Sequence, residues 1–164
     1  MAETSSGTWS LGESDHQRIT ELLHGLLHEC SARCALLVDR TGQLLAQAGE
    51  PLQFDPTAFA SLTAADFSAN DQLAKMIGEA EFASLFHQGE KESMYLADVA
   101  RRVILVVLFD QRTTVGLVRL RVRRTVLDLS KVFEELFSRY ASGRQPQRPL
   151  LEGADDEIDK LFGD

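Results

Sequence analysis

The stretch that decides the fold is Val103-Ile-Leu-Val-Val-Leu-Phe109, a run of apolar residues without a single interruption. Such a short continuous run, rich in β-branched side chains, is typical of an inner strand that is covered on both faces. It falls well below the roughly 18 residues that a membrane-spanning helix needs, and no apolar signal sequence follows Met1. We therefore expect a sheet covered on both faces, in a chain that is neither secreted nor inserted in a membrane.

Further extended segments are predicted on both sides of this strand. Residues 34–38 and 43–47 flank the loop 39–42, whose Gly42 favours a turn, and so predict a β-hairpin. Residues 93–99 come just before the inner strand, and residues 115–122 follow it with a less regular alternation. The prediction is an α+β fold, a three-layer α/β/α sandwich with a five-stranded, mainly antiparallel sheet.

Three helices are predicted from apolar residues at helical spacing. The first begins near Ser14, which has capping-box spacing with Gln17. The second begins at Asp55 and Pro56, a cap followed by a first-turn proline, and runs toward Gly78. The third ends before Gly143. The three apolar stripes are, in chain order, Ile19, Leu22, Leu23, Leu26, Leu27 and Cys30; Phe59, Leu62, Ala69, Leu73, Met76 and Ile77; and Leu129, Val132, Phe133, Leu136, Phe137 and Tyr140.

The central helix has flanks with little side-chain bulk. Ala60, Ala64 and Ala74 leave room for another backbone to approach closely. Asp66 and Asn70 interrupt the apolar stripe in the middle of the helix, which indicates either a kink or a helix that is only half buried.

The charge is concentrated at the end of the sequence. The chain of 164 residues, a length typical of one domain, has a net charge of −8. Residues 152–164 hold six acidic residues and one lysine, a net charge of −5, so the rest of the chain is nearly neutral. This balance argues against nucleic acid as a partner, because phosphate binding needs a broad basic surface. The one basic cluster, Arg119, Arg121, Arg123 and Arg124, is interpreted as a solvated sheet face that continues into a helix.

Motifs for catalysis or for cofactor binding are missing from the sequence. There is no glycine-rich phosphate-binding loop, and no nucleophile, base and orienting residue can be grouped. His24 and His28, with Glu21, have the spacing of metal ligands, but they lie opposite the apolar stripe and are better interpreted as solvent-exposed. Cys30 and Cys34 could form a redox pair, although core packing is the more common use of such residues. We expect no catalytic residue, no metal and no other cofactor.

Arg112 is the one residue whose position suggests action on another protein's nucleotide. It lies in a predicted hairpin turn beside a buried strand, where it could serve as an arginine finger. An exposed arginine in a turn is more often a solubilising residue, and we favour this interpretation.

The two ends of the sequence are predicted to lie outside the folded domain. Residues 1–13 form a mobile N-terminus, residues 14–142 the domain and residues 143–149 a linker. Residues 150–164 are an acidic segment in which Ile158, Leu161 and Phe162 have the spacing of one helical edge. This segment is expected to fold when it binds a partner.

Several motifs, taken in their order along residues 34–164, resemble the Roadblock/LC7 family. These motifs are Leu37-Val-Asp-Arg-Thr-Gly-Gln-Leu44, Leu62-Thr-Ala64, Leu73-Ala-Lys-Met-Ile-Gly-Glu79, Phe86-His-Gln-Gly89, Val103-Ile-Leu-Val-Val-Leu-Phe-Asp110, Thr114-Val-Gly-Leu-Val-Arg-Leu120 and Asp155-Asp-Glu-Ile-Asp-Lys-Leu-Phe162. The resemblance implies a profilin-like fold and a homodimer whose sheets join edge to edge. In that dimer the two central helices pair and form a platform for one Ras-like small GTPase.

The resemblance also implies a function in which this chain supplies no catalytic residue. The dimer would stimulate GTP hydrolysis by reshaping the GTPase, without an arginine finger, while the acidic segment would bind a second surface and influence nucleotide exchange. The implied contacts are Ala60, Ala64, Phe67, Ser68, Asp71, Gln72 and Lys75 on the central helix, and Ile158, Leu161 and Phe162 in the acidic segment. It further implies a cytoplasmic protein at a cell pole, with roles in cell polarity and gliding motility.

Two alternatives of a different class remain at this level. One is a dimeric scaffold that binds a GTPase or another protein without altering its turnover. The acidic segment favours a regulator, since a scaffold has no evident need for it. A small-molecule sensor domain is the more remote alternative, because no ligand-coordinating cluster is visible in the sequence.

Overall fold

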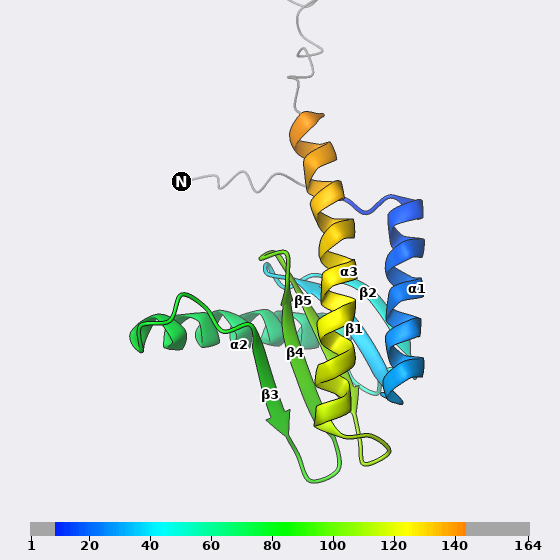
Figure 1. The fold of residues 1–164 in the computed structure, drawn as a ribbon, viewed down its shortest axis with the longest axis vertical. Coiled ribbons are helices and arrows are strands. Elements are labelled where there is room, and N and C mark those ends of the chain that lie inside the picture. Colours follow the sequence, from blue (N-terminus) through cyan, green and yellow to red (C-terminus); the bar gives the residue numbers. More distant parts are fainter. Residues whose placement is uncertain (1–8, 144–164) are drawn as a thin grey trace, which may run out of the picture.

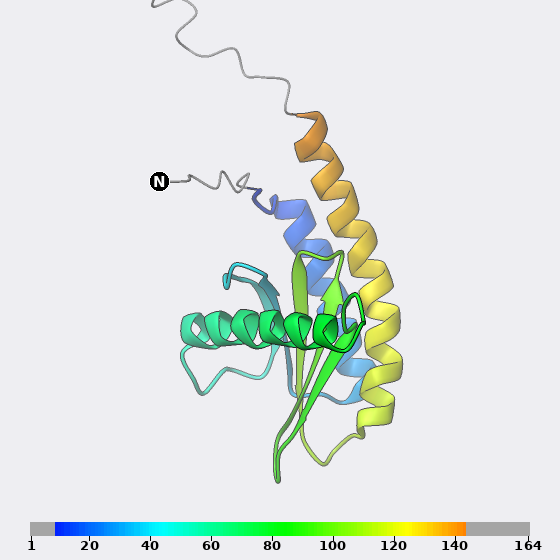
Figure 2. The same cartoon turned by 90° about the vertical axis from the view of Figure 1, so that its left-hand side faces the viewer.

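A computed structural model describes residues 9–143, which form one five-stranded sheet between two layers of helices (Figure 1). The strands are β1 (Cys34–Asp39), β2 (Leu44–Gly49), β3 (Ser84–Gln88), β4 (Ser93–Val99) and β5 (Val103–Phe109). Their order is β2-β1-β5-β4-β3, and every neighbouring pair is antiparallel. Helices α1 (Glu13–Cys30) and α3 (Val115–Ser142) cover one face, and α2 (Pro56–Met76) crosses the other (Figure 2). The predicted α+β sandwich is confirmed.

The central strand β5 is the predicted inner strand. It pairs with β1 on one side and with β4 on the other. Val103, Leu105 and Val107 lie in the core beneath α1 and α3, whereas Ile104 and Val106 lie in the core beneath α2. Since successive strand residues point to opposite faces, a strand with a core on each side needs an unbroken apolar run. The hairpin of β1 and β2 around Gly42 is also confirmed.

Helix α1 has the predicted apolar stripe but a different beginning. Its N-cap is Gly12, and no side chain caps it, so the expected capping box of Ser14 and Gln17 does not form. The residues just before the helix contact α3. Trp9 packs edge-on against Phe133, with ring centroids 5.9 Å apart. Residues 1–8, the rest of that predicted segment, lie outside the described residues.

The prediction of a strand at residues 115–122 is wrong, because these residues form the first turns of α3. The side chain of Thr114 accepts a hydrogen bond from the Leu117 amide at 3.3 Å and caps the helix. Val118, Val122 and Thr125 repeat every three or four residues and are all buried, in register with the predicted stripe that begins at Leu129. In the sequence, apolar residues alternate with arginines here, a pattern typical of a strand, although the buried residues form one continuous helical stripe. The four arginines of the basic cluster therefore lie on a helix and not on a sheet.

Strand β3 is the element that the sequence pattern did not reveal. It is a short edge strand that pairs only with β4, and its residues alternate too weakly in polarity to predict a strand. The ring of Phe86 on this strand stacks on Phe109, with centroids 6.1 Å apart. The sheet thus has five strands as predicted, with β3 in place of the segment that became α3.

Candidate partner-binding surface on the central helix

The start of α2 follows its sequence signals. The carboxylate of Asp55 accepts a hydrogen bond from the Thr57 amide at 3.1 Å, and Pro56 is the first helical residue. The helix then continues unbroken to Met76, with Asn70 buried and Asp66 partly exposed. Of the two alternatives for the polar interruption, a half-buried helix is the one observed.

The inner face of α2 is made of small residues and one aromatic ring. Ala60, Ala64, Phe67 and Ala74 are buried against the sheet. The alanines therefore let α2 approach its own sheet closely. Ala60, Ala64 and Phe67, three of the residues expected to contact a partner, lie in the interior of the described chain and not on its surface.

The expected apolar stripe lies mostly on the outside of α2. Leu62, Leu73 and Met76 have exposed fractions of 71, 57 and 82%, and Ile77, which follows the helix, is 71% exposed. We call Leu62, Ala69, Leu73 and Met76 the apolar flank of α2. Single exposed hydrophobic side chains are common, but several on one side of a helix are typical of an interaction surface.

The apolar flank lies on the side of α2 that faces the edge strand β3. Asp66 projects from that side, and its carboxylate is 2.7 Å from Nε2 of His87 on β3. The outer edge of β3 has no strand beside it within the described sheet, so its amide and carbonyl groups are free to pair with another chain. An apolar helix flank and an open strand edge therefore lie together.

The adjoining flank of α2 is polar, and it holds the other expected contacts. Ser68, Gln72 and Lys75 are exposed there. Asp71 is only partly exposed, because its carboxylate accepts a hydrogen bond at 2.5 Å from Arg40, in the turn between β1 and β2. Asp71 therefore fixes the helix to the hairpin, and three exposed polar side chains remain for a partner.

Arg40 joins three parts of the fold at the end of α2's polar flank. Its guanidinium also donates to Asp98 at the end of β4 and lies 4.9 Å from the centre of the Phe67 ring. Partial burial alone would lower the pKa of Arg40, but the hydrogen bonds to Asp98 and Asp71 outweigh it and raise the pKa. The positive charge of Arg40 is thus held in place beneath the helix.

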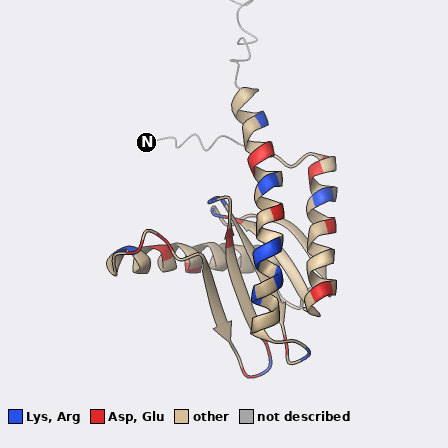
Figure 3. Ribbon diagram, viewed as in Figure 1, with Lys and Arg blue, Asp and Glu red and all other residues tan. Residues whose placement is uncertain are grey.

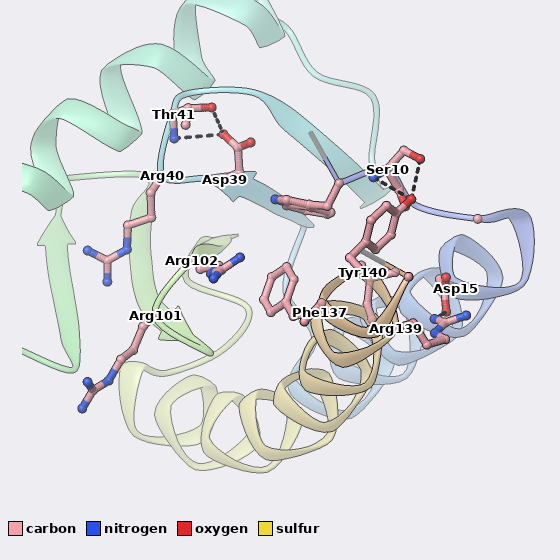
Figure 4. A pocket seen from close by; sticks show the side chains of 15 residues that line it. Ser10, Asp15, Asp39, Arg40, Thr41, Arg101, Arg102, Phe137, Arg139 and Tyr140 are labelled. Carbon is pink, nitrogen blue, oxygen red and sulfur yellow. Dashed lines mark hydrogen bonds and ion pairs between the residues drawn. The ribbon is translucent and has the colours of Figure 1, made fainter. Parts of the chain in front are cut away.

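A hollow of about 1070 Å³ opens where the hairpin turns meet the end of α3 (Figure 4). Tyr140 on its wall donates a hydrogen bond to the Ser10 carbonyl at 2.9 Å. The guanidinium of Arg102 lies 4.5 Å from the centre of the Phe137 ring, and Arg139 pairs with the buried Asp15 at 2.7 Å. These side chains are held in place by contacts within their own chain.

The histidines and cysteines lie as the sequence predicts. His24 and His28 are exposed on α1, and residues 9–143 contain no group of three metal-ligating side chains. Cys30 and Cys34 are free and buried, so the interpretation as core residues is confirmed. Burial raises the pKa of the Cys34 thiol to about 11, which keeps it protonated and unreactive.

Arg112 does not lie in a hairpin turn but in the connection from β5 to α3. Its guanidinium donates to Asp110 and to Glu50, each at 3.0 Å. The hydrogen bonds from Arg112 lower the pKa of Asp110, and those from Arg33 and Arg112 lower the pKa of Glu50. Two carboxylates of its own chain therefore hold this guanidinium.

Comparison with known proteins assigns the family. The model of the Roadblock/LC7 domain matches residues 18–109, more than half of the chain. The chain belongs to the Roadblock/LC7 family. No curated protein matches the sequence. Among the helices of residues 9–143, none has the length and apolar character needed to cross a membrane.

Within this family the chain is similar to solved MglB structures. MglB of Myxococcus xanthus is 44% identical with a TM-score of 0.73, over 77% of this chain and 95% of that one. The gliding protein MglB of Thermus thermophilus is 34% identical with a TM-score of 0.74, over 78% and 97% of the two chains. An MglB structure with a tetrameric arrangement is 33% identical with a TM-score of 0.75, over 79% and 97%. Profilin IA of Acanthamoeba castellanii, 15% identical with a TM-score of 0.51 over 71% and 96%, shares the fold alone.

Proposed function

We propose that this chain is an MglB-like regulator of a Ras-like small GTPase of the MglA type and stimulates GTP hydrolysis by that partner. The observation behind the proposal is the 44% identity to an MglB protein, which extends over 95% of that protein. The catalytic groups belong to the GTPase in this proposal. Our chain contributes a surface that changes the shape of the GTPase active site.

The proposed active form is a homodimer. Each α2 places its apolar flank against the α2 of the second copy, and the two β3 edges pair to extend the sheet. This arrangement buries Leu62, Leu73 and Met76, which are largely exposed in the single chain, and it satisfies the open edge of β3. The tetrameric arrangement of one similar MglB supports the expectation that the chain assembles with itself.

The paired helices form the proposed platform for the GTPase. Ser68, Gln72 and Lys75, which are exposed on the adjoining polar flank, form the part of the platform that contacts the GTPase in this proposal. The buried Ala60, Ala64 and Phe67 support this platform from below and do not contact the GTPase. Arg112 has no role as an arginine finger, since Asp110 and Glu50 hold it.

The acidic segment 150–164, with Ile158, Leu161 and Phe162, lies outside the described residues. We propose that it binds a second surface of the GTPase and influences nucleotide exchange. Its acidic residues suit a groove with basic rims, so this contact weakens as salt increases.

Single-turnover GTP hydrolysis by the MglA-type GTPase, with and without this chain, tests the proposal. We expect the chain to increase the rate, and Lys75→Ala to weaken the increase. Lys91→Ala is the matched control, because Lys91 is also an exposed lysine but lies outside the platform, between β3 and β4. Binding without any change in the rate would favour a passive scaffold instead.

Deletion of residues 150–164 tests the acidic segment separately. The sheet and its covering helices are complete without it, so folding and dimerisation should persist. The deletion should weaken GTPase affinity or slow nucleotide exchange, while hydrolysis under saturating conditions remains stimulated. Aggregation would show that the segment is part of the core, and unchanged affinity and exchange would show that it has no role with this partner.

A further inference from the structure

Helix α3 exposes a surface that combines two leucines with three arginines. Leu120 and Leu127, two turns apart, have exposed fractions of 59 and 66%. Arg119, Arg123 and Arg124 are exposed beside them. We call these five residues the basic face of α3. We propose that the basic face of α3 binds the acidic segment 150–164 of the same chain.

Residues 9–143 leave this face uncovered. Val118, Val122 and Leu129 form the buried side of α3, and the basic face lies on the side away from the sheet. Figure 3 shows the basic residues gathered on the first half of this helix. Within residues 9–143, Arg119, Arg123 and Arg124 make no ion pair, whereas the neighbouring Arg121 pairs with Glu29 at 3.5 Å. Three positive charges are thus available around two exposed leucines.

The acidic segment complements this face in both charge and apolar spacing. Its last 13 residues hold six acidic residues and one lysine. Ile158, Leu161 and Phe162 lie at i, i+3 and i+4, so a helix formed on binding would have one apolar edge between acidic residues. That edge fits against Leu120 and Leu127, while the acidic residues lie near the arginines.

Other surfaces of the chain suit this segment less well. The apolar flank of α2 carries no basic residue, so it suits a second copy of itself and not an acidic segment. In the hollow near Tyr140, Arg40 and Arg139 are paired with carboxylates, and Arg102 is stacked on Phe137. The basic face therefore offers the largest group of arginines without carboxylate partners in residues 9–143.

The connection is long enough for the segment to return along its own helix. A helix rises by about 1.5 Å per residue, so Leu127 lies roughly 23 Å before the end of α3 at Ser142. Residues 144–154, when extended, span up to roughly 35 Å. The acidic residues can thus reach the basic face of the same chain.

Docking on α3 does not compete with the proposed homodimer. The basic face and α2 lie on opposite sides of the sheet (Figure 2). A segment held on α3 is withheld from the GTPase, so α3 and the GTPase compete for it. This last consequence rests on the proposed function, but the docking itself needs no GTPase.

A spin label on the segment of the full-length chain tests the docking. Gly163→Cys supplies a thiol for attaching the label. The native Cys30 and Cys34 are buried and do not compete for it. A nitroxide there should remove most of the amide signal of residues 116–131 in nuclear magnetic resonance spectra at low salt. High salt should restore the signal, because the arginines are exposed and screened.

Charge reversal distinguishes docking on α3 from nonspecific electrostatic attraction between the acidic segment and basic residues elsewhere. Arg123→Glu with Arg124→Glu should restore the amide signal, and a further Asp155→Lys with Asp156→Lys should remove it again. Lys91→Glu with Arg101→Glu makes the same change in charge at exposed turns and should have no effect. If the α3 variant fails to fold, the salt dependence of the amide signal in the labelled chain with unaltered α3 tests the docking instead.

Three outcomes overturn the proposal. The first is full amide signal on α3 in the labelled chain, and the second is loss of signal at α2 or at the hollow instead. The third concerns a mixture in which one chain carries the label and another provides the observed amides. If the amide signal is lost there to the same extent, the segment binds α3 of a second copy. None of these measurements includes a GTPase, so docking without stimulated hydrolysis would contradict only the proposed function.

Discussion

The two faces of the sheet are covered in contrasting ways. On one face α1 and α3 bury large side chains such as Leu23, Leu129 and Phe133, and Trp9 closes the end of that layer. On the other face α2 presents alanines and Phe67 to the sheet and leaves Leu62 and Leu73 exposed. The chain buries the apolar side chains of one layer by itself and leaves several apolar side chains of the other exposed.

The difference has a chemical cause in how each helix is held. Helices α1 and α3 pack on each other as well as on the sheet, so each has two apolar neighbours. Helix α2 is alone on its face, and polar links at its sides supplement a narrow apolar contact: Arg40 with Asp71, and His87 with Asp66. A helix with one neighbour must either be polar on its remaining sides or bind something else.

The largest expected effect is in the α1 and α3 layer. Phe133→Ala should lower the free energy of unfolding by about 3–5 kcal/mol, because it removes a fully buried ring and leaves a cavity. Urea denaturation measures this loss. The loss should not depend on protein concentration, since all the contacts of Phe133 lie within one chain. A loss below about 1 kcal/mol would show that this layer is not the main source of stability.

The next effect concerns assembly through the other face. Leu73→Glu should convert the proposed dimer to a monomer at micromolar concentration without changing the circular dichroism spectrum. Leu120→Glu is the matched control, because Leu120 is as exposed as Leu73 but lies on α3. Sedimentation velocity distinguishes the two variants. An unmodified chain that sediments as a monomer would rule out the dimer altogether.

A smaller effect is expected in the rates at which the two layers open locally. These rates can be compared because each layer holds one cysteine. Cys30 lies in the core beneath α1 and α3, and Cys34 in the core beneath α2. With a pKa of about 11, about one Cys34 thiol in a thousand is ionised at pH 8, so alkylation is slow in the native state. We expect mass spectrometry to find Cys34 modified before Cys30. Equal rates would mean that both layers open together.

The smallest effect is expected at Arg112, outside both layers. An arginine finger contributes about 10³ to 10⁵ in rate, so its removal would be conspicuous. Arg112→Ala should instead leave stimulated GTP hydrolysis within a few-fold of the unmodified chain. A loss near the full range in the single-turnover assay would make Arg112 part of the reaction.

Local sequence signals predicted the elements whose start, turn or burial is set by a few adjacent residues. Asp55 and Pro56 set the start of α2, Gly42 set the hairpin turn, and the apolar run of β5 identified the inner strand. Residues 115–122 satisfied two patterns at once, and only the packing of Val118 and Val122 on the sheet distinguishes a helix from a strand there.

The orientation of α2 could not be read from its sequence in the same way. Its bulky stripe and its small-residue side are both apolar, so either could face the sheet. The close approach allowed by Ala60 and Ala74 decides between them, and this depends on contacts distant in sequence. For the same reason, sequence spacing grouped Ala60 and Ala64 with Ser68 and Gln72, which the fold places on different sides of the helix.

The position of Trp9 has a practical consequence for spectroscopy. It is the only tryptophan in the chain, and it contacts Phe133 and Phe137 of α3. Intrinsic fluorescence excited at the indole band therefore reports on the α1 and α3 layer and is silent about α2. Melting curves followed by tryptophan emission will record the loss of the α1 and α3 layer, so a test of the proposed dimer through α2 needs a separate optical probe.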